Sequence, residues 1–195
     1  MNDLQLNPAT TALLLMDLQA GIVESHPDSD AFLAGLRRAR ESARSAGLTV
    51  GYVRVALTAE DAAKAPATNP NFAAAAASGR LDDTQPATQI DARIAPAAGE
   101  IVVRKSRVGA FSTTDLREQL VARGVDTLVL AGIATSGVVL STVRDASDRD
   151  FRLVVLEDGC FDRDDEVHRV LTEKVFPRQA QVVTIDEFVS ALGAL

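Results

Sequence analysis

Cysteine is nearly absent from this sequence: Cys160 is the single thiol among 195 residues. One thiol excludes a disulfide within the chain and any zinc site built from several cysteines, and it fits a reducing compartment. Histidine is almost as scarce, and neither His26 nor His168 stands at metal-ligand spacing from a second histidine or cysteine. We therefore expect no metal and a cytoplasmic location.

Positive charge is scarce too, with 20 Lys and Arg residues against 27 Asp and Glu residues and a formal net charge of -7. Nucleic acids and anionic membranes are bound through clustered Lys and Arg, so we expect neither as the main partner. A small-molecule substrate fits better. No apolar run is long enough to cross a bilayer, and residues 1–12 lack the basic start and apolar core of a secretion signal.

Glycine-rich phosphate loops are also missing. Gly132 and Gly137 match neither the G-x-G-x-x-G pattern nor the Walker pattern. We therefore expect no nucleotide and no other cofactor.

What the sequence does contain is an alternation of short apolar runs with amphipathic stretches. It predicts one α/β domain over residues 1–195, with a doubly wound, mostly parallel six-stranded sheet and helices on both faces. The strands are expected at residues 12–16, 48–57, 100–104, 125–131, 151–156 and 181–185. The helices are expected at residues 29–46, 113–123, 136–149, 164–175 and 187–192, with Ser112 or Thr113 as the N-cap of the second. Residues 58–99 have little periodicity and predict surface loops with one or two short helical turns.

Three features follow predicted strands directly: Asp17 follows the first, Lys105 the third, and the turn 132–138 the fourth. The carboxyl ends of parallel strands share one rim of the sheet, where ligands of doubly wound folds bind. We therefore expect a site there. Each feature also has a plain structural interpretation, because an Asp at a strand end often caps a turn and a Lys beside Arg104 and Arg107 is often a solvated charge.

Three segments resemble motifs of the isochorismatase-like cysteine hydrolases: LLMDLQ at 14–19, VRKSRVGAF at 103–111 and AGIATSGVVLST at 131–142. The chain is identified as a member of that superfamily. The resemblance implies that Asp17 is the acid/base with Gln19 nearby, that Lys105 is the catalytic lysine, and that Phe111 is the aromatic residue that follows it. It also implies a homo-oligomer, a dimer or a tetramer.

The third motif implies a non-proline cis peptide at Ile133–Ala134 and an oxyanion hole made by the backbone N–H groups of Ala134 and Val138. It matches the family at Gly132, Thr135, Val139 and Thr142, and departs from it where the family has its nucleophilic cysteine, because Val138 stands there. Valine has no lone pair, so chemistry at this turn must proceed without a covalent thioester. The zinc-binding branch of the family is not matched either, since residues 53–61 contain no histidine.

Three interpretations follow from the missing thiol. In the first, Asp17 protonates the vinyl ether of an isochorismate-type substrate, water attacks and pyruvate leaves, with Val138 on the pocket floor; a related small carboxylate or amide is the broader version. In the second, the chain is a catalytically inactive small-molecule-binding or assembly module in which Asp17 and Lys105 remain as a structural ion pair. In the third, the valine is an artefact or an engineered change in a thiol hydrolase, which we rank last because Ser or Ala is the usual choice.

Several further side chains are candidates for this rim. Cys160 follows the fifth predicted strand, but a lone cysteine is more often a small buried hydrophobe, and its acidic neighbours disfavour a thiolate. The best cations for a substrate carboxylate are Arg54, Arg104 and Arg107, and each also has a surface interpretation.

Four further side chains are expected to make weak substrate contacts. They are Gln19 of the first motif, Phe111 of the second, Thr135 of the third, and His26, for which a surface position is favoured. His168 is expected on a solvated helix face. Residues 58–99 are expected to close over the pocket and to determine specificity.

Overall fold

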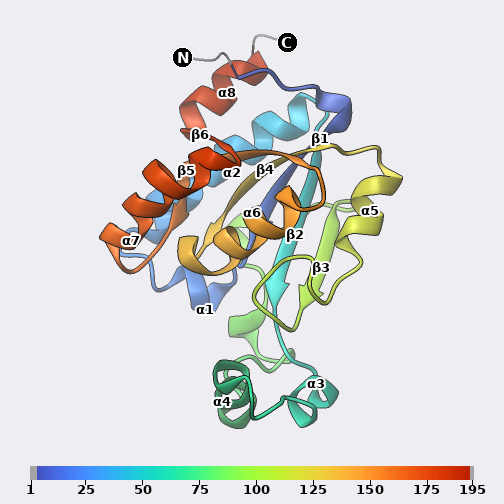
Figure 1. Ribbon diagram of the computed structural model, residues 1–195, viewed down its shortest axis with the longest axis vertical. Helices are drawn as coiled ribbons and strands as arrows, with labels where there is room; N and C mark the ends of the chain where they lie inside the picture. The colour runs from blue at the N-terminus through green and yellow to red at the C-terminus, as the bar shows by residue number, and fades with distance from the viewer. Residues whose placement is uncertain (1–3, 194–195) are drawn as a thin grey trace.

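The computed structural model, which describes residues 4–193, contains a sheet of six parallel strands in the order β3-β2-β1-β4-β5-β6 (Figure 1). The strands are β1 (Thr11–Met16), β2 (Thr49–Val55), β3 (Ile101–Lys105), β4 (Thr127–Ile133), β5 (Arg152–Phe161) and β6 (Gln181–Val183). This confirms the predicted fold class. Residues 1–3, part of the segment predicted to lack a secretion signal, lie outside the described residues.

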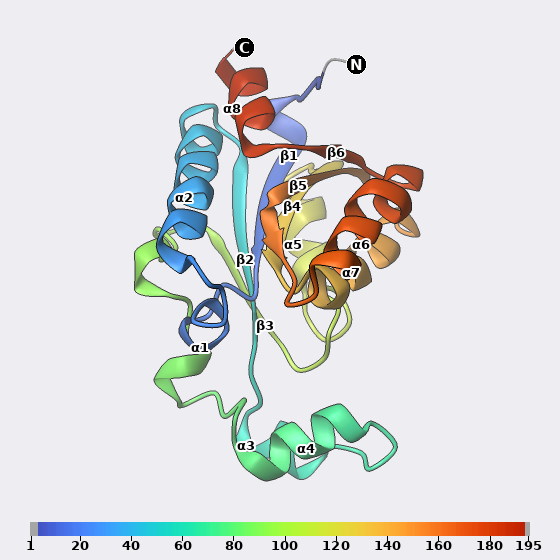
Figure 2. The same cartoon turned by 90° about the vertical axis from the view of Figure 1, so that its left-hand side faces the viewer.

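Helices cover both faces of the sheet (Figure 2). One face carries α2 (Ser29–Ser45) and α8 (Ile185–Gly193), and the other carries α5 (Leu116–Ala122), α6 (Leu140–Ser147) and α7 (Asp165–Val170), while α1 (Ala20–Val23) follows β1. Leu13 and Leu15 of β1 pack toward α2, whereas Leu14 and Met16 pack in the second core cluster with α5 and α6. Because β1 is buried on both faces, its sequence is almost wholly apolar, as is typical of central parallel strands.

The strand order reverses between β1 and β4, which pair directly. Met16 lies opposite Gly132, and a Cβ atom at Gly132 would stand 2.2 Å from the carbonyl oxygen of Met16. Only glycine therefore allows β4 to lie this close to the end of β1. The close approach brings Asp17 beside the turn that follows β4.

Two predicted boundaries were wrong for reasons that involve tertiary contacts. Strand β5 extends to Phe161 rather than ending at residue 156, because a register shift between Leu130 and Gly132 lets pairing continue at Cys160. Cys160 therefore lies inside the strand. Helix α5 begins at Leu116 rather than at residue 113, with Asp115 as its N-cap.

Neither predicted N-cap residue, Ser112 or Thr113, caps α5. The hydroxyl of Thr113 instead accepts a hydrogen bond from Ser106 N–H at 2.9 Å in the preceding loop. The hydroxyl of Thr114 donates to Ala110 C=O at 2.7 Å and accepts from Leu116 N–H, at the start of α5, at 3.3 Å.

Two predicted helices contain a π-helical turn, one at its start and one near its end. The helix predicted at 136–149 starts as a π-helical turn, Thr135–Val139, in which Gly137 has non-helical angles (φ -96°, ψ -105°), and continues as α6. The helix predicted at 164–175 consists of α7 followed by a second π-helical turn, Leu171–Val175. The first of these turns directly follows β4, and π-helical turns are frequent at functional sites.

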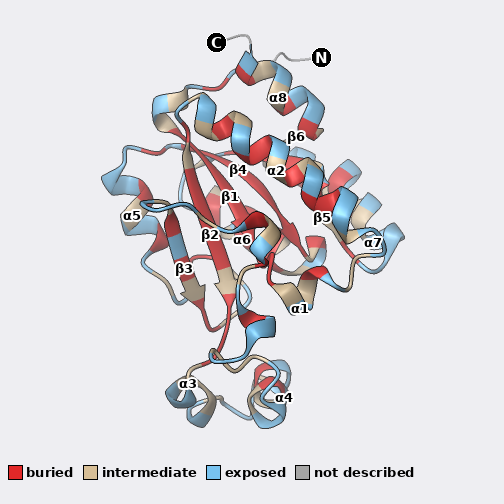
Figure 3. Cartoon of the chain, turned by 180° about the vertical axis from the view of Figure 1, so that it is seen from behind, coloured by how far each residue is buried: buried red, intermediate tan, exposed pale blue. Residues whose placement is uncertain are grey.

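Residues 58–84, here called the arm, extend beyond the carboxyl end of β2 and stand away from the sheet (Figures 1 and 2). The arm contains α3 (Ala59–Ala63) and α4 (Pro70–Ser78), and the return to β3 contains the 3-10 turns Pro86–Thr88 and Ala92–Ile94. This is more helix than the sequence predicts. Figure 3 shows the contrast between the buried sheet and the largely exposed arm. None of the helices between residues 4 and 193 is long and apolar enough to cross a membrane.

Candidate active site

Asp17 and Lys105 form a buried ion pair at the carboxyl ends of β1 and β3. The Lys105 ammonium donates to Asp17 Oδ2 at 2.8 Å and to Arg107 C=O at 3.2 Å, and the side chains of Lys105 and Asp17 are only 1% and 8% exposed. Asp17 adopts a left-handed φ of 55°, and its N–H donates to Val53 C=O at 2.7 Å. These contacts hold the carboxylate at the strand end, as topology predicts.

The environment of Asp17 suits proton transfer. Burial raises its pKa to about 6, against the opposing effects of the Lys105 charge and hydrogen bond. Its second oxygen, Oδ1, is buried without a hydrogen-bond partner among residues 4–193. Asp17 thus has one oxygen held by Lys105 and one oxygen free to carry a proton.

The turn after β4 has the geometry that the resemblance implies. The Ile133–Ala134 peptide is cis, and Ala134 C=O accepts hydrogen bonds from the N–H groups of Gly137 at 3.1 Å and Val139 at 3.3 Å. The side chain of Val138 is 2% exposed and belongs to the same core cluster as Cys160. Position 138 therefore contributes an apolar wall to the site.

Two contacts from residues after β5 hold this turn, and sequence reasoning missed both. Thr135 Oγ1 and His168 Nδ1 are hydrogen-bonded at 2.8 Å, and Ser136 N–H donates to Asp162 Oδ2 at 2.7 Å. The prediction that His168 lies on a solvated helix face was wrong, because the ring is half-buried against the turn. The one signal in the sequence for this contact is that His168 lies four residues after Asp164, the N-cap of α7. Nothing in the sequence links His168 to Thr135.

Asp162 is ionised in its contact with Ser136. Burial raises the pKa of this carboxyl. Hydrogen bonds from Ser136 and from the neighbouring backbone together lower the pKa by more, so the net shift is downward. The carboxylate therefore acts as a fixed acceptor for the turn.

Gln19 is fully occupied by backbone groups. Its Nε2 donates to Val55 C=O at 2.8 Å and to Thr88 C=O at 2.7 Å, while its Oε1 accepts from Val55 N–H at 2.7 Å. The side chain thus joins the ends of β1 and β2 to the 3-10 turn Pro86–Thr88. A substrate contact by Gln19 stays a prediction; the bonds that it makes support the site from behind.

The three predicted cations differ in how their charges are balanced. Arg54 lies 2.7 Å from Asp83, and Arg104 lies 2.6 Å from Asp61 and also donates to a backbone carbonyl. Arg107 has no carboxylate partner among residues 4–193. It is therefore the one uncompensated cation of the three.

Phe111 does not reach this cluster. Its ring stacks on Phe151 with ring centroids 6.0 Å apart and lies under the guanidinium of Arg149, and both partners follow the far end of α6. Phe111 therefore belongs to the core between the loop after β3 and α6.

Cys160 does not supply the missing nucleophile. Burial raises the pKa of its thiol to about 12; a backbone hydrogen bond with Gly132 lowers the pKa, and the Asp158 charge adds a smaller increase. The thiol stays protonated and packs as a small hydrophobe.

His26 lies near the rim in an aromatic stack. Its ring is 4.6 Å from that of Phe32 and 4.4 Å from that of Phe161, and burial lowers the pKa of the imidazole. The ring is half-buried rather than on the open surface that the sequence favours. Within residues 4–193 no group of three or more His, Cys, Asp or Glu side chains is placed to hold a metal ion.

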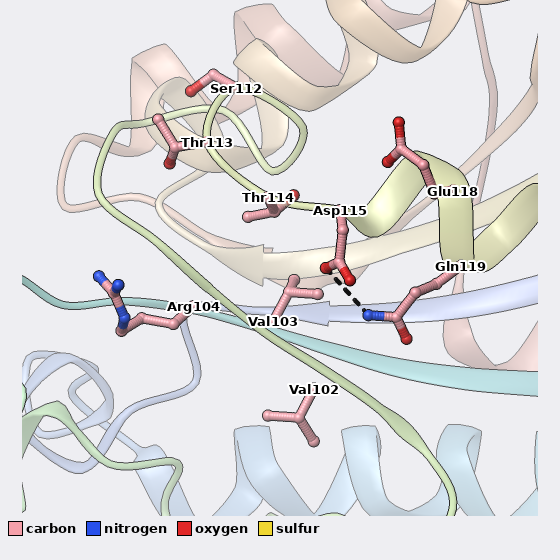
Figure 4. A pocket seen from close by; sticks show the side chains of 9 residues that line it. All are labelled: Val102, Val103, Arg104, Ser112, Thr113, Thr114, Asp115, Glu118 and Gln119. Atoms are coloured by element: carbon pink, nitrogen blue, oxygen red, sulfur yellow. Dashed lines mark hydrogen bonds between the residues drawn. The ribbon is translucent and has the colours of Figure 1, made fainter.

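Two hollows lie apart from Asp17 and Lys105. The smaller, about 290 Å³, lies within the arm, and the larger, about 680 Å³, opens beside β3 (Figure 4). The side chains around the larger hollow are mainly polar, and the Gln119 amide donates a hydrogen bond to the Asp115 carboxylate. Its lining residues are Val102, Val103, Arg104, Ser112, Thr113, Thr114, Asp115, Glu118 and Gln119. Neither hollow contains an acid with a perturbed pKa beside a buried lysine, so Asp17 and Lys105 stay the candidate site.

Comparison with known proteins agrees with the fold and the motifs. A family model described as the isochorismatase domain matches residues 11–187, and the chain belongs to this family. An uncharacterized isochorismatase family protein of Escherichia coli O157:H7, YecD, is 36% identical over 194 residues, which cover 97% of this chain and 100% of the relative. The N-carbamoylsarcosine amidase of Arthrobacter sp is 32% identical over 181 residues, covering 91% of this chain and 67% of the relative.

A solved structure gives the same architecture. The cysteine hydrolase of Pseudomonas syringae pv. phaseolicola 1448A matches with a TM-score of 0.88 and 22% identity, covering 98% of this chain and 96% of that chain. At this identity the match supports the fold alone.

Proposed function

We propose that this protein is a hydrolase that cleaves the vinyl ether of a small isochorismate-type carboxylate without a covalent intermediate. The observation that carries the proposal is Asp17, a buried acid with a pKa of about 6 and a free Oδ1, beside a turn whose position 138 is a valine. A pKa near 6 leaves about one molecule in ten protonated at pH 7, which is enough for a general acid.

The reaction balances with water as the sole co-reactant. Asp17 Oδ1 gives its proton to the terminal CH₂ carbon of the enolpyruvyl ether, and the ether oxygen stabilises the resulting oxocarbenium ion. Water adds to the cationic carbon and returns a proton to Asp17. The hemiketal then breaks its C–O bond, the hydroxyl proton passes to the leaving oxygen, and pyruvate and an alcohol are released.

The other groups support this step. Lys105 holds Asp17 Oδ2, which fixes the free oxygen in place, and its charge stabilises the carboxylate after the proton has left. The backbone N–H groups of Ala134 and Val138 are the proposed donors to the leaving oxygen as the hemiketal breaks, and Val138 keeps the floor apolar. A small amide is the alternative substrate, since one relative is an amidase.

A binding or assembly module without catalysis is the second candidate. It is favoured by the Asp17–Lys105 bond of 2.8 Å, since a buried ion pair needs no catalytic role to persist, and breaking one by removing a partner destabilises a fold by about 3–5 kcal/mol. Such a module should bind small molecules but release no product.

The test is pyruvate release from isochorismate by the purified protein. The wild type and the matched surface variant Asp148→Asn should release pyruvate, while Asp17→Asn should lose at least about 100-fold in rate because the proton donor is gone. Circular dichroism checks that Asp17→Asn is folded.

Absence of pyruvate from the wild type would contradict vinyl ether hydrolysis. Val138→Cys, assayed for ammonia release from N-carbamoylsarcosine, then separates the remaining candidates. Activity gained with the restored thiol would indicate a latent amidase, and no gain would favour the binding module.

A further inference from the structure

We propose that Arg107 binds the carboxylate of the substrate, and that Phe72 of the arm holds its guanidinium in position. This makes Arg107 the residue that selects anionic substrates, and it rests on the proposed function for the identity of the reacting group. Three observations support it: the connection of Arg107 to Lys105, its unsatisfied donors, and the position of Phe72.

The backbone of Arg107 contacts the Asp17–Lys105 ion pair. Its carbonyl oxygen accepts a hydrogen bond from the Lys105 ammonium at 3.2 Å, and that ammonium binds Asp17 at 2.8 Å. The backbone carbonyl of Arg107 is therefore a direct hydrogen-bond partner of Lys105, and the Arg107 side chain extends from this point.

The guanidinium retains most of its hydrogen-bonding capacity. A guanidinium has five N–H donors, and Arg107 uses Nη1 for a bond to Ser106 C=O at 2.5 Å. It is half-buried and lacks a carboxylate partner within the described chain, unlike Arg54 and Arg104, whose charges are balanced by acids. A half-buried guanidinium with free donors, on a residue whose backbone carbonyl contacts the Asp17–Lys105 ion pair, is suited to bidentate binding of a carboxylate.

Phe72 gives this guanidinium a platform. The carbon Cζ of Arg107 lies 5.2 Å from the centroid of the Phe72 ring, within the range of a cation–π contact. Phe72 is 8% exposed and packs with Val55 and Leu57, which end and follow β2, and with Ile22 in α1. The arm is therefore anchored at the same rim as Asp17. This contact holds the cation without using its N–H donors, which stay available to a ligand.

The charge of the whole chain strengthens the need for such a group. With a formal net charge of -7, the protein repels small anions at long range. An anionic substrate therefore requires a local cation, and Lys105 is already paired with Asp17.

The test measures binding and needs no turnover. Chorismate is the anionic probe, because it carries an enolpyruvyl ether and two carboxylates, and its dimethyl ester is the uncharged probe. By titration calorimetry, Arg107→Gln should weaken chorismate binding at least about tenfold, because charge-assisted hydrogen bonds are lost. Binding of the dimethyl ester should change less than about twofold. Arg107→Lys keeps the positive charge but loses the bidentate donor geometry, so its affinity for chorismate should lie between those of the wild type and Arg107→Gln.

Two more variants control for the fold and for the platform. Arg123→Gln removes an exposed arginine far from the rim and should bind chorismate as the wild type does. Phe72→Leu keeps an apolar side chain but loses the ring, and should weaken chorismate binding about threefold. With isochorismate as substrate, Arg107→Gln should raise KM and leave kcat nearly unchanged, which distinguishes it from Asp17→Asn.

The outcomes separate this inference from the proposed function. Arg107-dependent binding of chorismate without pyruvate release from isochorismate would uphold the anion site and reject vinyl ether hydrolysis. Wild-type affinity in Arg107→Gln, an equal loss for the dimethyl ester, or no binding of chorismate by the wild type would each overturn the inference.

Discussion

Asp17 is a carboxyl group under two opposing influences. Burial raises its pKa to about 6 from 3.8, while the Lys105 ammonium at 2.8 Å lowers it. Burial has the larger effect, so the protonated form persists to higher pH than for an exposed aspartate. The direction of the shift decides the sign of the pH dependence.

If Asp17 is the acid, kcat/KM for isochorismate should be constant below pH about 6 and fall about tenfold per unit above it, because the active form is the protonated one. A steady-state pH profile checks this. Lys105→Met removes the cation that lowers the pKa, so the falling limb should move to higher pH in that variant. An activity that rises through pH 6 instead would make Asp17 a general base, as amide chemistry requires.

The positions of Asp17 and Lys105 could be predicted from sequence because both lie at strand ends: Asp17 directly follows β1, and Lys105 is the last residue of β3. The raised pKa of Asp17 could not be predicted, because it depends on how far the carboxyl is buried. The partners of Arg54 and Arg104, which are Asp83 and Asp61, lie in the arm. That segment has no periodicity from which a contact could be derived, so Arg107 could not be singled out in advance.

At the level of elements, the turn Thr135–Val139 is fixed from outside itself. Thr135 shares one hydrogen bond with His168 of α7, and Ser136 N–H donates another to Asp162 in the loop after β5. Because Gly137 departs from helical angles, the turn has little internal regularity to hold its shape. The two external contacts therefore position Ala134 and Val138.

His168 acts through Thr135, so we expect it to be a positioning residue. His168→Leu should lower kcat about tenfold with little change in KM, and lower the free energy of unfolding by about 1 kcal/mol, as loss of one hydrogen bond does. Asn can place a side-chain amide, which can donate or accept, where Nδ1 stands, so His168→Asn should restore most of kcat. Steady-state kinetics and urea unfolding measure both effects.

A double-mutant cycle with Thr135→Val is the check on this coupling. The effects of His168→Leu and Thr135→Val on kcat should be strongly non-additive, because either change breaks the same bond. Additive effects would mean that the two residues act independently, and Arg169→Leu, an exposed neighbour on α7, should leave kcat unchanged.

Among the elements that the sequence predicted least well are β4 and the helix that follows it. The fourth strand was predicted at 125–131 and lies at Thr127–Ile133, and the helix after it begins as a π-helical turn. Apolar runs and helical periodicity report burial along a regular element. They carry no information on the register shift opposite Cys160 or on the angles of Gly137, which tertiary contacts impose.

For the whole molecule, hydrophobic patterning was sufficient to predict the architecture. Each strand of the six-stranded sheet was found, and the convergence of Asp17, Lys105 and the turn after β4 follows from the strand order. The arm was predicted as loops because its alanine-rich helix α4 buries little, with Phe72 and Ala75 as its buried residues. The homo-oligomer expected from the family stays a prediction.

The same shortage of buried contacts makes the arm the least stable part of the molecule. Opening it exposes few apolar side chains, whereas all seven residues of β4 are buried. In native-state hydrogen exchange, amides in α4 should exchange at least about 1,000-fold faster than those in β4, since local opening costs less than global unfolding. If Phe72 holds Arg107 against a bound anion, chorismate should slow exchange in α4 of the wild type and have little effect in Arg107→Gln. Equal protection of α4 in both proteins would mean that the arm responds to the ligand by a route other than Arg107.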